Sequence, residues 1–168
     1  MPVGNKRQTA NLYHYTVGQH IIKIIEQGAI LPATVGLPKG ERPIVWFSSS
    51  PTWDETCNKG AVQNGQPILL TREQTAAEYG GLFRVIVLPD VAPYSWQRLR
   101  FLSKMHPAIA DKLEETARAV GSNSDEWFGT FKSVTRDKWT AIETLVDEGW
   151  VSYDLPKSVA AESRLTRE

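Results

Sequence analysis

The segment from Asn11 to Gly28 constrains the fold more than any other part of this chain of 168 residues. Asn11–Tyr15 is a short apolar and aromatic run that predicts a β-strand. Val17–Gln27 carries valine and isoleucine near helical spacing, which predicts an amphipathic helix. Gly28 stands where a left-handed residue ends such a helix. We therefore expect a strand that runs directly into a helix.

His14 lies near the end of that predicted strand. Thr16 and Gln19 match the capping-box pattern, in which a hydroxyl and an amide satisfy free backbone groups of the first helical turn. An imidazole beside a helix N-terminus is well placed to bind an anionic or polar ligand. A buried His that only makes a structural hydrogen bond at a strand end is the alternative interpretation.

The remaining segments alternate strand and helix patterns. Strands are predicted at Pro43–Ser49, Ile68–Thr71, Leu82–Leu88, Thr140–Val146 and Trp150–Tyr153. Helical segments are predicted at 51–59 and over 94–120, where Pro107 opens a second helix and Gly121 ends it, and 122–130 is predicted to be a loop. We expect one α+β domain at 11–155, with a helical insertion at about 94–121, a flexible N-terminus at 1–10 and a polar tail at 156–168.

Composition excludes several classes of protein. The 19 basic and 19 acidic residues cancel, so no global attraction to nucleic acid or membranes is implied. Cys57 is the only cysteine, which excludes an internal disulfide and a thiolate zinc site. The polar start, Met1–Thr9, resembles no secretory signal, and no apolar run approaches the ~20 residues of a membrane span. We expect a cytoplasmic protein without a metal.

Three segments resemble the ADP-ribosyltransferase superfamily, in particular its PARP-like and DarT-like branches and the related RNA 2′-phosphotransferases. They are His14-Tyr15-Thr16 with the following Ile24–Pro32, then Ile44–Ser48, then Ala141–Val146, in the order of the family's motifs. The resemblance implies a split β-sheet around a cleft, with NAD as co-substrate. It also implies a mono-ADP-ribosyltransferase that modifies a nucleic acid or a protein, of the kind found among toxins and effectors, with an antitoxin or another protein as partner.

The resemblance assigns roles to residues. His14, Tyr15, Thr16, Arg42, Trp46 and Ser48 are expected to bind NAD, with Arg42 at the pyrophosphate and Trp46 against the nicotinamide. Trp46 alternates with Val45 and Phe47 along its strand and therefore faces the opposite way. The PARP branch has Tyr at the position of Trp46, so this chain keeps the aromatic face and lacks the hydroxyl.

Glu143 is the expected catalytic carboxylate, together with His14. It lies between Ile142 and Thr144 on a late, otherwise apolar strand, where a carboxylate is costly unless it is paired or borders a cleft. Cleavage of the bond between ribose and nicotinamide develops positive charge, which a carboxylate stabilises. We expect Glu143 to face the same cleft as His14.

The predicted insertion at 94–121 gives a hypothesis for the acceptor. Trp96, Arg98, Arg100 and Lys104 combine aromatic and basic side chains, a pattern suited to stacked bases and phosphates of DNA or RNA. A solvated helix face is the alternative for these residues.

Two other functions stay open. One is an RNA 2′-phosphotransferase-like enzyme, which relies on several arginines in the cleft. The other is a catalytically silent relative that binds a nucleotide or a partner protein. Motifs of Rossmann domains, P-loop enzymes and zinc proteases are absent from the sequence, and Cys57 has acidic neighbours that disfavour a reactive thiolate.

Overall fold

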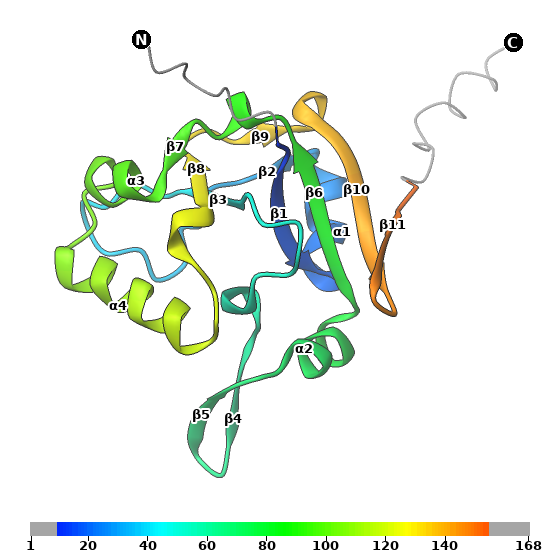
Figure 1. The fold of residues 1–168 in the computed structure, drawn as a ribbon, viewed down its shortest axis with the longest axis horizontal. Coiled ribbons are helices and arrows are strands. Elements are labelled where there is room, and N and C mark those ends of the chain that lie inside the picture. Colours follow the sequence, from blue (N-terminus) through cyan, green and yellow to red (C-terminus); the bar gives the residue numbers. More distant parts are fainter. Residues whose placement is uncertain (1–9, 155–168) are drawn as a thin grey trace, which may run out of the picture.

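The computed structural model describes residues 10–154 and forms an α+β fold around one seven-stranded sheet (Figure 1). Its strands are β1 (Leu12–Val17), β3 (Val45–Ser48), β6 (Leu82–Val87), β7 (Tyr94–Ser95), β8 (Trp127–Thr130), β10 (Trp139–Val146) and β11 (Gly149–Ser152). They are ordered β11-β10-β6-β1-β3-β8-β7, and all neighbours are antiparallel. The predicted α+β class is confirmed at this level.

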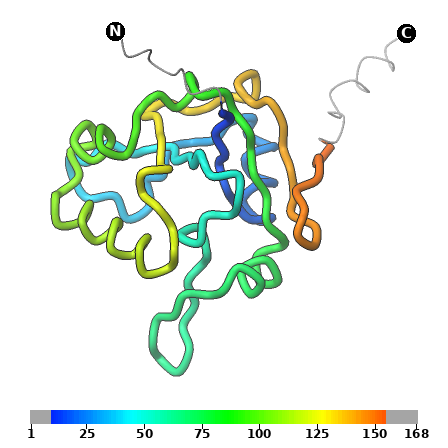
Figure 2. Tube along the Cα trace, in the orientation of Figure 1, coloured from blue at the N-terminus to red at the C-terminus, as the bar shows by residue number. Residues whose placement is uncertain are grey.

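Four helices and two small strand pairs complete the described chain. The helices are α1 (Gly18–Gln27), α2 (Arg72–Tyr79), α3 (Trp96–Leu102) and α4 (Pro107–Ala119). The pairs are β2 (Ala29–Ile30) with β9 (Val134–Thr135), and β4 (Gly60–Gln63) with β5 (Gln66–Leu69). The β4–β5 hairpin projects from the body of the molecule (Figure 2). Within residues 10–154, no helix has the length and apolarity needed to cross a membrane.

Three hydrophobic clusters hold these layers together, and the smallest is formed by Tyr15, Val17, Trp53 and Leu82. In the first, Ile21 and Ile24 of α1 pack against Phe47, Val85 and Ile142 of the sheet. The second lies under α3 and α4, and its buried residues are Ile44, Trp96, Leu99, Ala110, Ala117 and Trp127. The apolar stripe of α1 therefore covers the middle strands, whereas α3 and α4 cover the strands at the β7 end.

The sheet opens between β1 and β3. Six residue pairs join β1 to β6, from Leu12↔Val87 to Val17↔Leu82. A single pair, Tyr13↔Ser48, joins β1 to β3. Beyond that pair the two strands separate and leave a fork, and this fork positions the site described below.

Several local predictions are confirmed. Gly28 ends α1 with φ = 68° and donates to the carbonyls of Ile24 and Ile25. Pro107 opens α4, β6 lies where its alternating pattern indicated, and β10 with β11 forms the predicted hairpin.

Other predictions were wrong. Thr16 belongs to β1 and does not cap α1, whose N-cap, Val17, has no side-chain cap. A capping box exists instead at Thr71 and Gln74, at the start of α2, where the same sequence pattern occurs and the sequence analysis overlooked it. The segment 51–59 contains only one short 3₁₀ turn, η1 (Glu55–Cys57). Trp127–Thr130 is a strand and not a loop, because pairing with β3 and β7, distant in sequence, defines it.

Gly18 permits the tight passage from β1 into α1. Its N–H donates to the Gly81 carbonyl at 3.0 Å, so the chain before β6 runs close to it. A Cβ at Gly18 would lie 2.1 Å from the Gly80 carbonyl oxygen and 2.6 Å from the Gly80 carbonyl carbon. These are backbone atoms held by the surrounding fold, so no side chain fits here.

We expect Gly18→Ala to lower the free energy of unfolding by about 1–3 kcal/mol, the range of overpacking substitutions. Urea unfolding followed by circular dichroism measures this change. Gly149→Ala is the matched control, because the nearest atom to a Cβ at Gly149 is 3.9 Å away. Equal stability of the two variants would contradict the steric argument.

Candidate functional site

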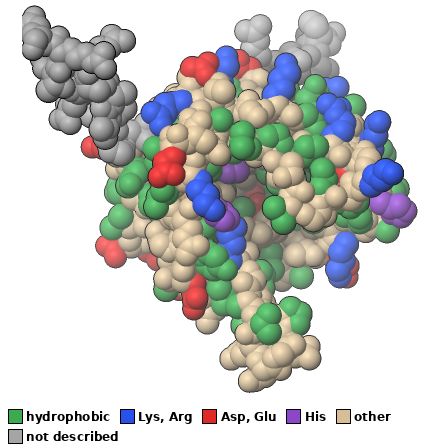
Figure 3. All heavy atoms as spheres, turned by 180° about the vertical axis from the view of Figure 1, so that it is seen from behind, with side chains coloured by type: hydrophobic (Ala, Val, Ile, Leu, Met, Phe, Trp, Pro, Cys, Tyr) green, Lys and Arg blue, Asp and Glu red, His purple; other side chains and the backbone are tan. Residues whose placement is uncertain are grey.

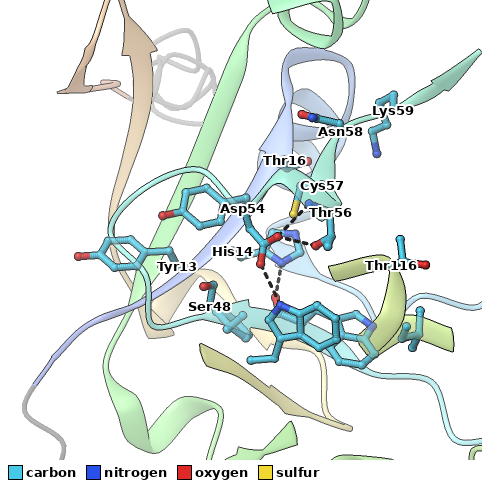
Figure 4. Close-up of a pocket in the computed structure, with 15 residues that line it drawn as sticks. Tyr13, His14, Thr16, Ser48, Asp54, Thr56, Cys57, Asn58, Lys59 and Thr116 are labelled. Carbon is cyan, nitrogen blue, oxygen red and sulfur yellow. Dashed lines mark hydrogen bonds between the residues drawn. The ribbon is translucent and has the colours of Figure 1, made fainter. Parts of the chain in front are cut away.

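A cavity of about 400 Å³ lies at the fork between β1 and β3 (Figure 4). Its walls come from these two strands, the loop after β3, helix α4 and strand β8. The lining residues are Tyr13, His14, Tyr15, Thr16, Trp46, Phe47, Ser48, Asp54, Thr56, Cys57, Asn58, Lys59, Leu113, Thr116 and Trp127. Five of the six residues predicted to bind NAD are therefore among the lining, and Arg42 is not. A volume of this size is within the range of small-molecule sites.

His14 closes the inner end of the fork. Its Nδ1–H donates to the carbonyl of Trp46 at 2.8 Å (Figure 4). The imidazole thus satisfies the Trp46 carbonyl, which lies on β3 just beyond the point where the pairing of β1 with β3 ends. The ring also meets Phe47 edge-on, with centroids 5.7 Å apart, which fixes its orientation.

The imidazole of His14 is neutral at pH 7, because its pKa is lowered. Burial is the largest cause that lowers its pKa below 6.5; the bond to Trp46 raises it, and the charges of Lys59 and His20 lower it. A carbonyl only accepts hydrogen bonds, so the proton of the neutral ring is on Nδ1. Nε2 therefore carries a lone pair and accepts from a donor such as a ligand hydroxyl.

Trp46 supplies part of the cavity's aromatic wall. Its indole packs against Trp96 and Trp127, with centroids 5.9 and 6.1 Å away. Val45 and Phe47 lie in the cluster under α1, so the predicted alternation along this strand is confirmed. Trp46 is only partly buried and borders the cavity.

Asp54 organises the loop after β3, where the sequence predicted a helix with Asp54 on a face that either completes the cleft wall or only packs. One carboxylate oxygen accepts from the Thr56 N–H, the Thr56 hydroxyl and the Ser122 hydroxyl at 2.6–2.9 Å. The other accepts from the Trp127 indole at 2.9 Å. The spacing of Asp54 and Thr56 is a turn-forming pattern visible in the sequence, but the other two donors come from distant segments. This carboxylate is saturated and is structural.

The thiol of Cys57 is protonated at neutral pH. Burial, followed by the charge of Asp54, raises its pKa to about 12. The thiol is therefore not a nucleophile and only forms part of the cavity wall.

Arg42 lies away from the cavity. Its guanidinium stacks on Phe131, 3.7 Å from the ring centroid, and donates to the Leu102 carbonyl at 3.4 Å. The loop before β3 is tied to the end of α3 by the Arg42 N–H, which donates to the Ser103 carbonyl at 2.8 Å. The expected contact between Arg42 and a pyrophosphate in this cavity is therefore wrong for this structure.

The expectation that Glu143 faces the same cleft as His14 is also wrong. Glu143 pairs in register with Arg84, and Arg84 with Tyr15, whereas His14 aligns with Val85. Neighbouring residues on a strand point to opposite faces, so Glu143 and His14 lie on different sides of the sheet. Glu143 is not among the residues that line the cavity.

The Glu143 carboxylate is part of a partly buried ion pair. Arg84 Nε–H donates to it at 2.6 Å, and Arg84 also donates to the Pro51 carbonyl at 2.7 Å. The guanidinium lies 4.4 Å from the ring centroids of both Tyr13 and Trp150. The side chain of Glu143 keeps 23% of its surface exposed. Arg84 is the residue that the sequence analysis overlooked here.

Two of the four aromatic and basic side chains predicted to contact an acceptor are already engaged in contacts within the protein. Trp96 is 1% exposed, and its indole donates to Glu114 at 2.6 Å. Arg100 forms ion pairs with Glu114 and with Asp111. Trp96 is therefore core and cannot stack on bases, and the charge of Arg100 is neutralised.

Arg98 and Lys104 remain exposed on this helical segment. The guanidinium of Arg98 lies 5.2 Å from the Tyr94 ring centroid. Without Trp96 and Arg100, the predicted aromatic and basic surface is reduced to these two cations and Phe101, whose side chain is 75% exposed.

Comparison of the chain with protein-family models, with curated proteins and with solved structures finds no match. Among residues 10–154, no three His, Cys, Asp or Glu side chains gather as metal ligands do.

The pKa of His14 predicts a stability that depends on pH. The folded-state pKa lies below the unfolded value of 6.5, so below pH 6.5 the unfolded chain binds more protons. Stability is then lost as the pH falls, by up to about 1.4 kcal/mol per pH unit for one proton. Urea unfolding between pH 7.5 and 5.5 measures this slope.

The pKa of His20 is lowered in the same direction, mainly by its burial and then by Lys59 and Lys23. We therefore compare His20→Gln with the double variant His14→Gln/His20→Gln, which isolates the effect of His14. The double variant should show the shallower slope. Identical slopes would mean that folded His14 takes up its proton as readily as the unfolded chain.

Proposed function

We propose that the cavity binds NAD and that this protein is an NAD-dependent mono-ADP-ribosyltransferase. The observation that carries the proposal is the position of His14 in the fork between β1 and β3. A neutral imidazole held through Nδ1 offers Nε2 to a ribose hydroxyl. Trp46, Tyr15 and Ser48 surround the same space with aromatic and hydroxyl groups, which suit a flat ring joined to a ribose.

The proposed reaction breaks the bond between ribose C1′ and nicotinamide. Nicotinamide leaves with the bonding electron pair, the acceptor forms the new bond to C1′, and a base takes the acceptor's proton. A carboxylate near C1′ stabilises the positive charge that develops. The carboxylate of Asp54 borders the cavity but is saturated by four hydrogen bonds, so Glu143 is the acid to test.

The ion pair of Glu143 with Arg84 favours a second candidate, a catalytically silent relative that binds a nucleotide. In this state the carboxylate is held on the far side of Tyr15, which borders the cavity and pairs with Arg84. Transfer requires Glu143 to leave Arg84 and to reach the ligand from the face of the sheet opposite to His14, whereas binding alone does not. The acceptor of the proposed transferase is a nucleic acid or a protein.

Release of nicotinamide from NAD distinguishes these functions. We expect purified protein to release nicotinamide, and Glu143→Gln to slow the release by about 10²–10⁴-fold, the contribution of a positioned acid or base. Gln still accepts a hydrogen bond from Arg84, so the fold and NAD binding should persist. The control Glu148→Gln changes an exposed carboxylate on the same hairpin and should keep full activity.

Each result has a defined meaning. Full activity of Glu143→Gln would remove Glu143 from the mechanism. Binding of NAD without any release of nicotinamide would establish the silent relative. Absence of NAD binding, measured by calorimetry, would overturn both candidates.

We expect NAD to quench tryptophan fluorescence, because Trp46 and Trp127 both border the cavity. Trp46→Phe keeps an aromatic wall and should lose a measurable part of the quenching. Trp150→Phe is the control, since Trp150 packs on Tyr15 and Arg84 and does not line the cavity. If Trp150→Phe removes the quenching and Trp46→Phe does not, the ligand binds elsewhere.

A further inference from the structure

Lys59 is a cation that borders the cavity without a partner. Among the lining residues it is the only Lys or Arg. Within residues 10–154 no carboxylate lies within ion-pair distance of its ammonium group, and its side chain is half-buried. An ammonium group in this setting keeps its hydrogen-bond donors free for a ligand.

The backbone holds Lys59 at a fixed position. It lies at the base of the β4–β5 hairpin, where its N–H donates to the buried hydroxyl of Thr75 at 3.1 Å. Its carbonyl accepts from the Leu70 N–H at 2.8 Å. The stem of the side chain therefore starts from an anchored point beside the cavity.

The lining carries two opposite charges, on Asp54 and on Lys59, and these two groups differ in how free they are to contact a ligand. The Asp54 carboxylate is covered by four donors, and His14 is neutral. The charge of Lys59 reaches both His14 and His20, since it lowers the pKa of each. On the face opposite to that of Figure 1, the surface is hollowed above the β4–β5 hairpin, and histidine and basic side chains lie beside the hollow (Figure 3).

Several other polar groups of the lining already have partners. The Thr56 hydroxyl already donates to Asp54, and the Thr116 hydroxyl donates to the Lys112 carbonyl. The Asn58 amide donates to Glu55 and accepts from Trp53. Lys59 is thus the group in this cavity best able to donate to an anion.

We propose that Lys59 binds a phosphate group, so that the cavity takes a phosphorylated nucleotide and discriminates against the matching nucleoside. This inference rests on the proposed function and moves the pyrophosphate contact from Arg42 to Lys59. A lysine ammonium binds phosphate as a compact point charge, without the planar fork that arginine offers. Its attraction is strengthened where the side chain is partly withdrawn from water.

The test measures binding of ADP, adenosine and inorganic pyrophosphate by calorimetry at fixed ionic strength. Lys59→Met should weaken the binding of ADP and of pyrophosphate by about 10- to 100-fold, the range for a charged hydrogen bond. The affinity for adenosine should stay within about twofold of the original. Lys59→Arg keeps a cation and should recover most of the loss. The control Lys23→Met removes an exposed charge that also acts on His20 but lies outside the cavity, and it should change nothing.

The outcomes separate this inference from the proposed function. Unchanged ADP binding by Lys59→Met overturns the inference and leaves NAD binding standing. If Lys59→Met loses affinity for ADP and for adenosine equally, the inference is also overturned, because Lys59 then shapes the cavity and does not select phosphate. Binding of pyrophosphate through Lys59 without binding of NAD supports the phosphate site and rejects the proposed function.

Discussion

The hydrogen bond from His14 to the Trp46 carbonyl is the contact on which the site depends. Antiparallel strands normally satisfy such carbonyls through each other's N–H groups. Here β1 and β3 pair at one position and then separate, so a buried carbonyl beyond that point needs another donor. The imidazole provides it and keeps the fork open. A side chain without a donor at position 14 would leave the carbonyl unsatisfied or allow the strands to close.

Among the described residues, the cavity lining has one cation, Lys59, that forms no ion pair, because the other charged groups nearby are already paired or hydrogen-bonded. Arg84 and Glu143 neutralise each other between aromatic rings on the other face of the sheet. Asp54 is covered by four donors and ties the loop after β3 to β8. Lys59 forms no ion pair with any residue between 10 and 154 and borders the cavity together with the neutral His14. Of the two charged side chains in the lining, Lys59 is therefore the one with hydrogen-bonding capacity left for a ligand.

The ion pair of Glu143 links stability to the proposed chemistry. The Arg84 side chain is 9% exposed, so removing Glu143 from this partly buried pair would leave a charge with little access to water, which is unfavourable. A carboxylate that must leave its arginine before it can act is therefore restrained in this state. Tyr15 lies between the pair and the cavity, since it borders the cavity and stands next to Arg84 in the sheet.

Local patterns in the sequence determined the strand and helix around His14, the end of α1 at Gly28, the β10–β11 hairpin and the opposite directions of Trp46 and Phe47. These features depend on residues that are close in the chain, so periodicity and turn residues suffice to predict them. The tertiary structure alone decided the face of Glu143, because a shift of one residue in register moves a side chain across the sheet. It also decided the hydrogen bonding of the Asp54 carboxylate, whose donors Ser122 and Trp127 lie 68 and 73 residues away in the sequence.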